Sequence, residues 1–426
     1  MRFAFVVALL AIVIRLVPIP AGVRPLFSDE RDYDRLARTL AATGRYEDEG
    51  RPTAYRSVGY PAFTAAIYRV AGPRPEAVRV VQAILDGATA FLLFLLARGS
   101  GIAAARGAAL LWAFFPPAIL YSRFLRPETA TAFLLVTIAV ALSRESSLSR
   151  TRRFGVGLLL GLAALVRSEF LLVLPMIPFV IEPGAGRLRR SALLLAGACL
   201  VIVPWVVRNA VVVGAPTIAT SVGGAFLIGN HPAATGGYAP SVPDSMRPRA
   251  AGEAEASKEA YENAARFISD HPARFVTGIT RKWAFMIMGE SELVVSSFHP
   301  HPADGATSFR EKARAVPVWI HAAVSVPYAL LLLLGMIGYF SPPGGIAPRF
   351  FLSIVAAWLI VHGVTFGGSR FHFPWMPFLA ASAASLFGNF RSRLGTMSLR
   401  SRLLAVSISA FAVTVWLVEL YVVWHR

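Results

Sequence analysis

The sequence contains very little cysteine and little charge of any kind. Cys199 is the only cysteine among 426 residues, so the chain cannot form an internal disulfide. Cys199 lies in an apolar run, where we expect it to be packed. Charged residues make up 15% of the sequence, whereas about 25% is typical of soluble domains. Together with 55% hydrophobic residues, this excludes an ordinary soluble domain.

Lysine is also scarce, and the basic residues are almost all arginine. Only Lys258, Lys282 and Lys312 are lysine among 42 basic residues, and the formal net charge is +18. The arginines are spread among loops instead of forming one patch, so we expect no nucleic-acid partner. In a membrane protein this excess first indicates topology and contact with lipid phosphates.

Apolar stretches recur at the length of about 17–25 residues that a transmembrane helix needs. They lack the alternation typical of barrel strands, which favours helices. The sequence therefore predicts an all-α polytopic membrane protein with about eleven spans. The spans are expected at 3–20, 76–97, 106–122, 128–143, 154–166, 169–181, 191–208, 317–340, 350–366, 373–390 and 403–423. The start also resembles a signal peptide, but Arg15 interrupts the apolar run and favours a retained span.

Arginines in short turns predict the orientation of the spans. Four turns on one side are rich in arginine: Arg98 and Arg106; Arg144, Arg150, Arg152 and Arg153; Arg187, Arg189 and Arg190; Arg391, Arg393, Arg400 and Arg402. We expect this side to be cytoplasmic, with the N-terminus cytoplasmic and the C-terminus outside. Nine arginines in the loop 21–75 oppose this orientation, but four turns outweigh one loop.

Two long loops are then expected on the outer side, at 21–75 and 209–316. They suggest three parts: an N-terminal transmembrane module 1–208 that carries the first outer loop, the extracytoplasmic loop 209–316, and C-terminal helices 317–426. Helical spacing of apolar residues predicts surface helices over 29–41 and 60–70, and further helices over 253–269 and 273–288. Ser28 is a natural N-cap for the first.

Asp29 and Glu30 form an acid pair shortly after the first span. Such acids can simply interact with the dipole at a helix N-terminus. Alternatively, an outward-facing carboxylate at headgroup level can act as a general base on an acceptor hydroxyl. Burial in a partly apolar cleft is expected to raise the pKa of Asp29, whereas a helix N-terminus lowers it. The acid pair alone leaves both readings open.

Longer motifs point to a family. The acid pair is followed by YDRLARTLAATGRY, PTAYRSVGYPAFTAAIY and PWVVRNAVVVGAPTIATSVGGAFLIGN, and later by HPARFVTGITRKW and SRFHFPWMPFLA. In this order they resemble the GT-C superfamily of membrane glycosyltransferases, in particular the bacterial branch related to protein O-mannosyltransferases and lipid A aminoarabinose transferases. The resemblance runs from residue 3 to 390. It implies a GT-C-like bundle with amphipathic interfacial helices and a large extracytoplasmic loop.

The resemblance also implies an activity. It is the inverting transfer of a sugar from a polyprenyl-phosphate donor to a hydroxyl of a glycolipid, polysaccharide or protein. The transfer is expected on the outer side of the bacterial inner membrane, and the enzyme is expected to be a monomer. Asp29 matches the catalytic base of the family. Its partner Glu30 would orient the acceptor or bind a divalent cation. A divalent cation is the only cofactor that the resemblance suggests. Glu128 is the first candidate for a second acid, and Glu169 is the next candidate.

The departing polyprenyl phosphate gains negative charge, so cations placed beside it lower the barrier. Arginine suits phosphate because its planar guanidinium donates two hydrogen bonds. The outer-facing candidates are Arg56, Arg123, Arg126, Arg167, Arg208 and Arg370. We favour Arg370, with His372 two residues later, followed by Arg56 and Arg126. Family members often carry a phosphate-binding lysine in the first loop; this loop has none, so arginine would substitute.

The remaining polar residues give weaker indications of a functional site. Arg15, within the first span, is expected to pair with a carboxylate or carbonyl. His299 and His301 lack the further ligands of a zinc site, and His231 and His271 read as turn residues.

Glycines at 155, 157 and 161 favour close helix packing over a nucleotide loop. No Walker or dinucleotide motif is present. A transporter or flippase remains an alternative because of the intramembrane charge, although no paired repeats are visible. A non-catalytic envelope assembly protein is a third possibility, for which Asp29 would be replaceable.

Overall fold

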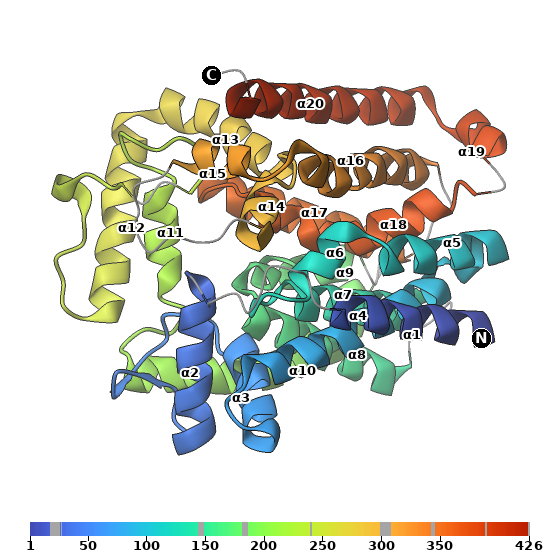
Figure 1. Ribbon diagram of the computed structural model, residues 1–426. Helices are drawn as coiled ribbons and strands as arrows, with labels where there is room; N and C mark the ends of the chain where they lie inside the picture. Colours follow the sequence, from blue (N-terminus) through green and yellow to red (C-terminus); the bar gives the residue numbers. More distant parts are fainter. Residues whose placement is uncertain are drawn as a thin grey trace.

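The computed structural model describes residues 1–17, 26, 28–143, 149–180, 186–238, 241–298, 308–341, 346–387 and 390–424. Long helices run roughly alongside one another across the molecule, and shorter helices gather at one end (Figure 1). The helices of the bundle are α1 (Arg2–Leu16), α4 (Pro75–Ala97), α5 (Ile102–Ala113), α7 (Glu128–Ser143), α8 (Arg150–Val166), α10 (Arg187–Val212), α16 (Val318–Phe340), α17 (Ile346–Val364), α18 (Met376–Ala384) and α20 (Leu399–Trp424).

Five helices are long and apolar enough to cross a membrane: Pro75–Ser100, Arg187–Val212, Val318–Phe340, Ala347–Val364 and Leu399–Trp424. Their outward faces are apolar, since Leu200, Val207 and Leu403 are exposed large hydrophobic residues. Without surrounding lipid this exposure would be unfavourable. The chain is therefore a multi-pass integral membrane protein, as its composition predicts.

Three predicted spans are not continuous α-helices. The segment 106–122 is divided into α5 and α6 (Pro116–Tyr121), because Pro116 and Pro117 cannot donate backbone hydrogen bonds within a continuing helix. The segment 169–181 contains the 3₁₀ helices η2 (Ser168–Leu172) and η3 (Leu174–Met176) before the short α9 (Ile177–Val180). The segment 373–390 begins within the 3₁₀ helix η5 (Ser369–Trp375), ahead of α18.

The glycines of α8 allow close contact with α10. A Cβ atom at Gly157 would lie 2.0 Å from Leu194 O, and one at Gly161 would lie 2.8 Å from Ala198 O. The two backbones therefore approach too closely for any larger residue, which confirms the predicted packing role of these two glycines. Gly155 has no neighbour within 4 Å and does not take part.

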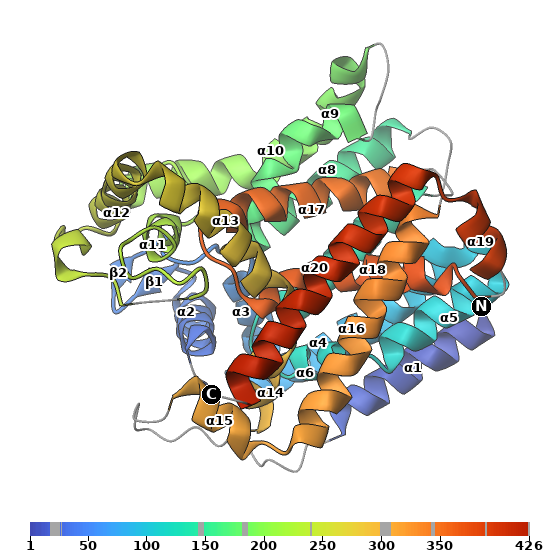
Figure 2. The same cartoon turned by 90° about the horizontal axis from the view of Figure 1, so that it is seen from above.

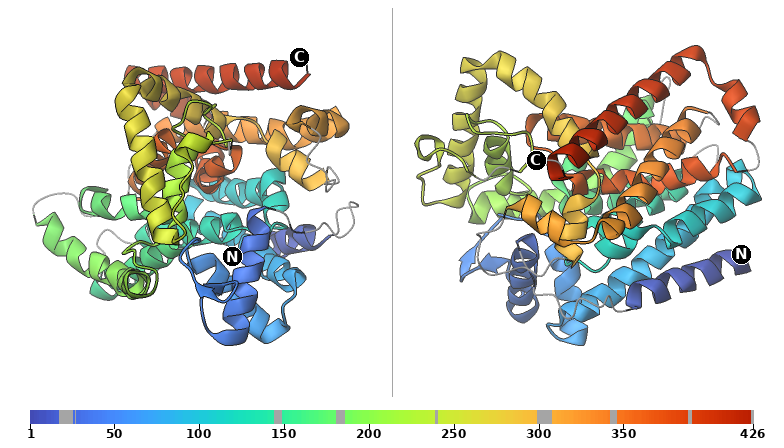
Figure 3. Two further views of the ribbon diagram at one scale, coloured as in Figure 1. Left: turned by 90° about the vertical axis from the view of Figure 1, so that its left-hand side faces the viewer. Right: turned by 45° about the horizontal axis from the view of Figure 1, so that its top comes forward.

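The shorter elements of the loops gather at one end of the bundle, where α2, α11 and α12 lie (Figures 1 and 2). These elements are α2 (Asp29–Thr43), β1 (Glu47–Asp48), β2 (Arg51–Pro52), α3 (Gly59–Ala71), α11 (Ser221–Ile228), η4 (Asp244–Met246), α12 (Glu253–Asp270), α13 (Pro272–Ile287), α14 (Ser291–Phe298) and α15 (Phe309–Ala315). The four helices predicted in the two long loops are confirmed as α2, α3, α12 and α13. In the left view of Figure 3, α11 and α12 lie side by side.

The ends of the chain mark the two ends of the bundle. The start of α1 lies with α19 (Phe390–Thr396) and η1 (Arg98–Ser100) at one end, and the end of α20 lies with α2 and α12 at the other (Figure 2). The arginine-rich turns at Arg98 and Arg393 thus share the end that holds the N-terminus.

Arg15 lies inside the bundle, 4% exposed, and pairs with Asp86 of α4. Its guanidinium also donates to Trp112 O and Ala113 O, and Trp112 Nε1 donates to Asp86 at 2.8 Å. The predicted structural pairing of Arg15 is confirmed. Cys199, by contrast, is exposed on α10, so the prediction that it is packed is wrong.

Candidate functional site

The candidate site forms where α2 begins. Asp29 is the first residue of this helix, and Glu30 and Asp32 share its first turn. Carboxylates in this position interact favourably with the helix dipole. Ser28 occupies the predicted N-cap position with φ of 50°, but its side chain makes no capping hydrogen bond. The backbone thus places Asp29 without the predicted cap.

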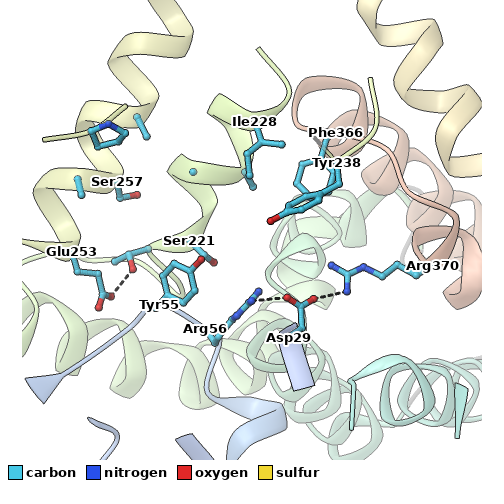
Figure 4. Close-up of a pocket in the computed structure, with 16 residues that line it drawn as sticks. Asp29, Tyr55, Arg56, Ser221, Ile228, Tyr238, Glu253, Ser257, Phe366 and Arg370 are labelled. Carbon is cyan, nitrogen blue, oxygen red and sulfur yellow. Dashed lines mark hydrogen bonds and ion pairs between the residues drawn. The ribbon is translucent and has the colours of Figure 1, made fainter. Parts of the chain in front are cut away.

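Asp29 lies between two arginines that come from distant parts of the chain (Figure 4). Its Oδ1 accepts a hydrogen bond from Arg56 Nη2 at 2.7 Å, and its Oδ2 accepts one from Arg370 Nη1 at 2.5 Å. Asp32 accepts a second bond from Arg56 Nη2, at 2.8 Å. The Asp29 carboxylate is 14% exposed, and the side chains of Arg56 and Arg370 are 20% and 23% exposed. All three groups can therefore be reached from outside.

Aromatic rings hold both guanidinium groups in place. The Arg56 guanidinium lies 5.6 Å from the Tyr33 ring and 5.1 Å from the Tyr55 ring. Arg370 lies 5.2 Å from the ring of Phe371. Such cation–π contacts stabilise a cation without neutralising it. Both arginines thus retain positive charge for a further anion.

The two ion pairs determine how Asp29 ionises. Burial alone raises the pKa of its carboxyl group, but the charges of Arg370 and Arg56 and the hydrogen bond from Arg370 lower it. Overall the pKa of Asp29 lies well below its usual range. The sequence left the net direction open; burial does raise this pKa as predicted, but two guanidinium groups outweigh desolvation.

A pocket of about 310 Å³ opens beside Asp29, Arg56 and Arg370. Its walls come from the first outer loop, from α11 and α12, and from the segment that leads into η5 (Figure 4). The aromatic side chains Tyr55, Tyr238 and Phe366 and the hydroxyl-bearing Thr220, Ser221 and Ser257 line it. A ligand here would contact apolar ring faces, hydroxyl groups and two cations.

Glu253 joins the two outer loops at the edge of this pocket. Its carboxylate accepts hydrogen bonds from Thr53 Oγ1 at 2.7 Å, from Ala54 N at 2.8 Å and from Thr220 Oγ1 at 2.5 Å. Glu253 is also the first residue of α12, so its charge interacts with the dipole of that helix. No local sequence pattern marks Glu253, because its partners are up to 200 positions away.

Glu30 and Arg126 are linked by the turn between α6 and α7. Glu30 is fully buried, and its Oε1 accepts a hydrogen bond from Leu125 N at 2.8 Å. The neighbouring Arg126 is 6% exposed and lies 5.0 Å from the Phe124 ring. Its charge reaches Asp29 and contributes to the low pKa of that residue. Glu30 thus fixes the turn that brings Arg126 towards the site.

Glu128 begins α7 and lies in a loose chain of buried charged groups. Glu128 Oε1 is 3.7 Å from Arg167 Nη2, Arg167 Nε is 4.0 Å from Glu169 Oε1, and Glu169 Oε1 is 3.9 Å from His362 Nε2. Neither oxygen of Glu128 has a hydrogen-bond partner, although the residue is only 1% exposed. The charge of Glu128 also acts on Arg370. The candidate second acid therefore lies near the arginines, behind the pocket wall.

His372 has a different environment from Arg370. Its side chain is fully buried; Nδ1 lies 2.8 Å from Met286 O, and Nε2 lies 3.0 Å from Glu290 Oε1. A carbonyl can only accept, so Nδ1 donates to Met286 O, and Nε2 faces the Glu290 carboxyl group. Tyr328 stacks on the imidazole at 4.3 Å between ring centroids. These contacts fix η5, which also carries Arg370, whereas phosphate binding by His372 stays a prediction.

Two of the three remaining candidate arginines bind backbone carbonyl groups. Arg208 donates to Thr53 O and Tyr46 O, and so fixes the first outer loop. Arg123 donates to Val17 O. Arg167 belongs to the chain of charges around Glu128. The site therefore brings together Asp29, Arg56 and Arg370, with Arg126 nearby.

The structure bears on two further sequence-based predictions, metal binding and turn histidines. Within the described residues, no three His, Cys, Asp or Glu side chains are grouped to hold a metal ion. A cation at Glu30 stays a prediction. His271 is confirmed at the break between α12 and α13, and His231 lies in the turn after α11. His299 and His301 lie outside the described residues.

Comparisons with known proteins bear on the fold and on one segment of the sequence. Residues 56–207, less than half of the chain, match the family model described as dolichyl-phosphate-mannose-protein mannosyltransferase. The whole fold is similar to that of ArnT from Cupriavidus metallidurans bound to undecaprenyl phosphate, with a TM-score of 0.52 and 14% identity over 99% of this chain. The chain spans 64% of the length of that protein. No curated protein matches the sequence.

The Archaeoglobus fulgidus oligosaccharyltransferase tethered to an acceptor peptide is less similar. Its TM-score is 0.47 and its identity 13%, over 97% of this chain and 53% of that one. The family model and the fold of ArnT confirm the resemblance to GT-C membrane glycosyltransferases that the sequence motifs predict.

Proposed function

We propose that this GT-C chain is an inverting glycosyltransferase that moves a sugar from a polyprenyl-phosphate donor to an acceptor hydroxyl outside the bacterial inner membrane. The observation that carries the proposal is the position of Asp29 between Arg56 and Arg370 at the edge of a pocket. The matched family is described as using dolichyl-phosphate mannose, and the similar ArnT structure contains undecaprenyl phosphate. Both support a lipid-linked donor.

Arg56 and Arg370 have the chemistry to bind the donor phosphate. As the bond between the anomeric carbon and the phosphate oxygen breaks, the leaving group gains negative charge, and guanidinium groups already in place stabilise it. They come from the first outer loop and from η5, so they can contact one phosphate from two directions. In the proposal Arg126 adds positive charge, and the Glu290–His372 pair keeps η5 in position.

Asp29 is the proposed general base. The acceptor oxygen attacks the anomeric carbon from the face opposite the phosphate, its proton passes to Asp29, and polyprenyl phosphate leaves with the bonding electrons. A carboxylate bound by two arginines is a weak base. A donor phosphate that attracts the same guanidinium groups would weaken their contacts with Asp29 and raise its pKa. Donor binding would therefore prepare the base for the acceptor.

The other acids have supporting roles in this proposal. Glu30 positions the turn at Leu125, and Glu128 balances the charge of Arg370 and Arg167 from behind the pocket. A glycolipid, polysaccharide or protein hydroxyl would reach Asp29 through the pocket mouth formed by the long outer loop. The working unit is proposed to be a monomer.

Donor turnover tests the proposal. The purified chain in lipid nanodiscs is given polyprenyl-phosphate donors carrying different sugars, with a membrane extract as acceptor. Release of polyprenyl phosphate is then quantified by mass spectrometry. We expect release from at least one donor, and roughly 10²-fold slower release by Asp29→Asn. Binding of polyprenyl phosphate without consumption of any donor would instead support a transporter or assembly role.

A further inference from the structure

We propose that the pocket beside Asp29 accepts a single uncharged sugar ring and discriminates against cationic amino sugars. This inference rests on the proposed function, because it names the class of group that the enzyme transfers. It follows from the size of the pocket, from the hydrogen bonds of its carboxylates, and from the space beside Gly224.

The size of the pocket limits what it can enclose. Its volume of about 310 Å³ is at the lower end of the range of about 300–1,000 Å³ that ligand pockets span. There is room for one monosaccharide ring, while an oligosaccharide would extend beyond the walls. Tyr55, Tyr238 and Phe366 offer ring faces to the C–H surface of a sugar, and Ser221 and Ser257 offer hydroxyl groups to its polar edge.

The charges that line the pocket decide which rings it favours. The charged lining residues are Asp29, Arg56, Glu253 and Arg370. Both oxygens of Asp29 are bound by arginine, and the carboxylate of Glu253 accepts three hydrogen bonds from the chain. In the donor complex the phosphate attracts the two guanidinium groups, so an ammonium group could pair only with Asp29, and that ion pair would occupy the base that the acceptor hydroxyl needs.

Carboxylates that lie outside the pocket lining, or are already bound, do not offer a partner to an ammonium group. Glu128 is 1% exposed and does not line the pocket. Asp32 is bound by Arg56 and by Arg35. A hydroxyl group has no net charge and can donate to or accept from its neighbours. The pocket thus suits a hydroxyl at each sugar position better than an ammonium.

Gly224 offers a place to alter this charge. It lines the pocket, and a Cβ atom added there would meet no other atom within 4 Å. The adjacent Gly223 is different, because its Cβ would lie 2.2 Å from Ser257 O. A short side chain at position 224 can therefore enter the pocket while α11 and α12 stay packed.

The experiment compares donors that differ in one group. Polyprenyl-phosphate arabinose and polyprenyl-phosphate 4-amino-4-deoxyarabinose, together with neutral hexose donors, are offered to the wild-type chain in nanodiscs. We expect release of polyprenyl phosphate from a neutral donor to be at least roughly tenfold faster than from the amino donor, a difference equivalent to about 1.4 kcal/mol. Equal rates, or a preference for the amino sugar, would overturn the inference while leaving the transferase function intact.

Gly224→Asp and Gly224→Asn provide a matched pair of variants. The two side chains have nearly the same shape, and only aspartate adds a negative charge to the pocket. We expect Gly224→Asp to raise the ratio of amino-sugar to neutral-sugar turnover at least fivefold over Gly224→Asn, roughly 1 kcal/mol, with similar melting temperatures. An unchanged ratio would contradict the charge argument. If no donor, neutral or cationic, is consumed by any form of the chain, the proposed function fails and this inference fails with it.

Discussion

Asp29 and Arg370 are 341 positions apart in the sequence, yet Arg370 Nη1 donates to Asp29 Oδ2 at 2.5 Å. This ion pair joins the start of α2 to η5, and so links the first outer loop to the C-terminal helices. Arg56 completes the arrangement from the other side of the carboxylate.

Replacing Asp29 with asparagine should remove the base and keep the shape of the side chain. We expect release of polyprenyl phosphate to slow by roughly 10²-fold or more, measured by mass spectrometry at matched protein concentration. Asp32→Asn is the matched control, because Asp32 also binds Arg56 from the first turn of α2. If both variants lose activity equally, Asp29 acts only by holding Arg56.

Arg370→Gln should change both the rate and its dependence on pH. Arg370 lowers the pKa of Asp29, so the base stays ionised as the pH falls. Without Arg370 this pKa rises, and the acid limb of kcat/KM should move to higher pH. The maximal rate should fall roughly 10²-fold, as for other lost charge-stabilising donors.

Arg38→Gln is the control for that experiment, since the Arg38 side chain is 43% exposed and pairs with Asp34 on the same helix α2. Exposed pairs contribute little, so its profile should match wild type. A pH profile for Arg370→Gln that also matches wild type would mean that Asp29 does not control the acid limb.

Glu290→Ala should loosen η5. It leaves His372 Nε2 buried without its partner, and an unpaired buried polar group costs about 1–3 kcal/mol of stability. We expect a lower melting temperature and slower donor turnover, because η5 carries Arg370. Glu292→Ala is the comparison for melting temperature, since the hydrogen bond that Glu292 accepts from Ser369 Oγ is long, at 3.3 Å. A melting temperature unchanged from wild type would show that the Glu290–His372 contact does not stabilise the fold.

Glu253→Ala should loosen the contact between the two outer loops at the edge of the pocket, where Thr220 N and Ala54 O also hold them together. Thr53, Ala54 and Thr220 would lose their common acceptor. We expect a higher KM for the donor, and a kcat that falls less than in Asp29→Asn, because the charged groups remain. Glu255→Ala, an exposed change in the same helix, should behave as wild type. An unchanged KM would argue that the loops stay together without Glu253.

Lys282 should make stability depend on pH in a predictable direction. It is 2% exposed, and Nζ donates to Asn230 Oδ1 at 2.9 Å. Burial lowers its pKa to about 8 from the ordinary value of 10.5. Between these values the unfolded chain binds more protons than the folded chain, so this residue's contribution to stability increases as the pH rises.

Melting temperatures measured from pH 8 upwards test this prediction. Wild type should gain stability relative to Lys282→Met, which has no group to titrate at this position. If the difference in melting temperature between wild type and Lys282→Met stays constant over this range, the carbonyl partners keep the Lys282 ammonium charged.

Much of the fold could be predicted from local patterns. The surface helices at Asp29–Thr43 and Glu253–Asp270 follow from apolar residues at helical spacing, and the long apolar runs indicate spanning helices. The interruption at Pro116 shows the limit of such patterns. Hydropathy averaged over a window does not register a residue that ends one helix and begins another.

The sequence by itself determined the membrane class, the family resemblance and the first carboxylate of the site, because hydropathy, motif order and the helical spacing of apolar residues are properties of neighbouring residues. Only the tertiary structure decided that Arg56 and Arg370 meet on Asp29, that this lowers the pKa of Asp29, and that Glu253 ties the loops together. The energy of an ion pair depends on the distance in space between its two charges and weakens as they separate. Residues hundreds of positions apart in the sequence carry no local sign that they will meet.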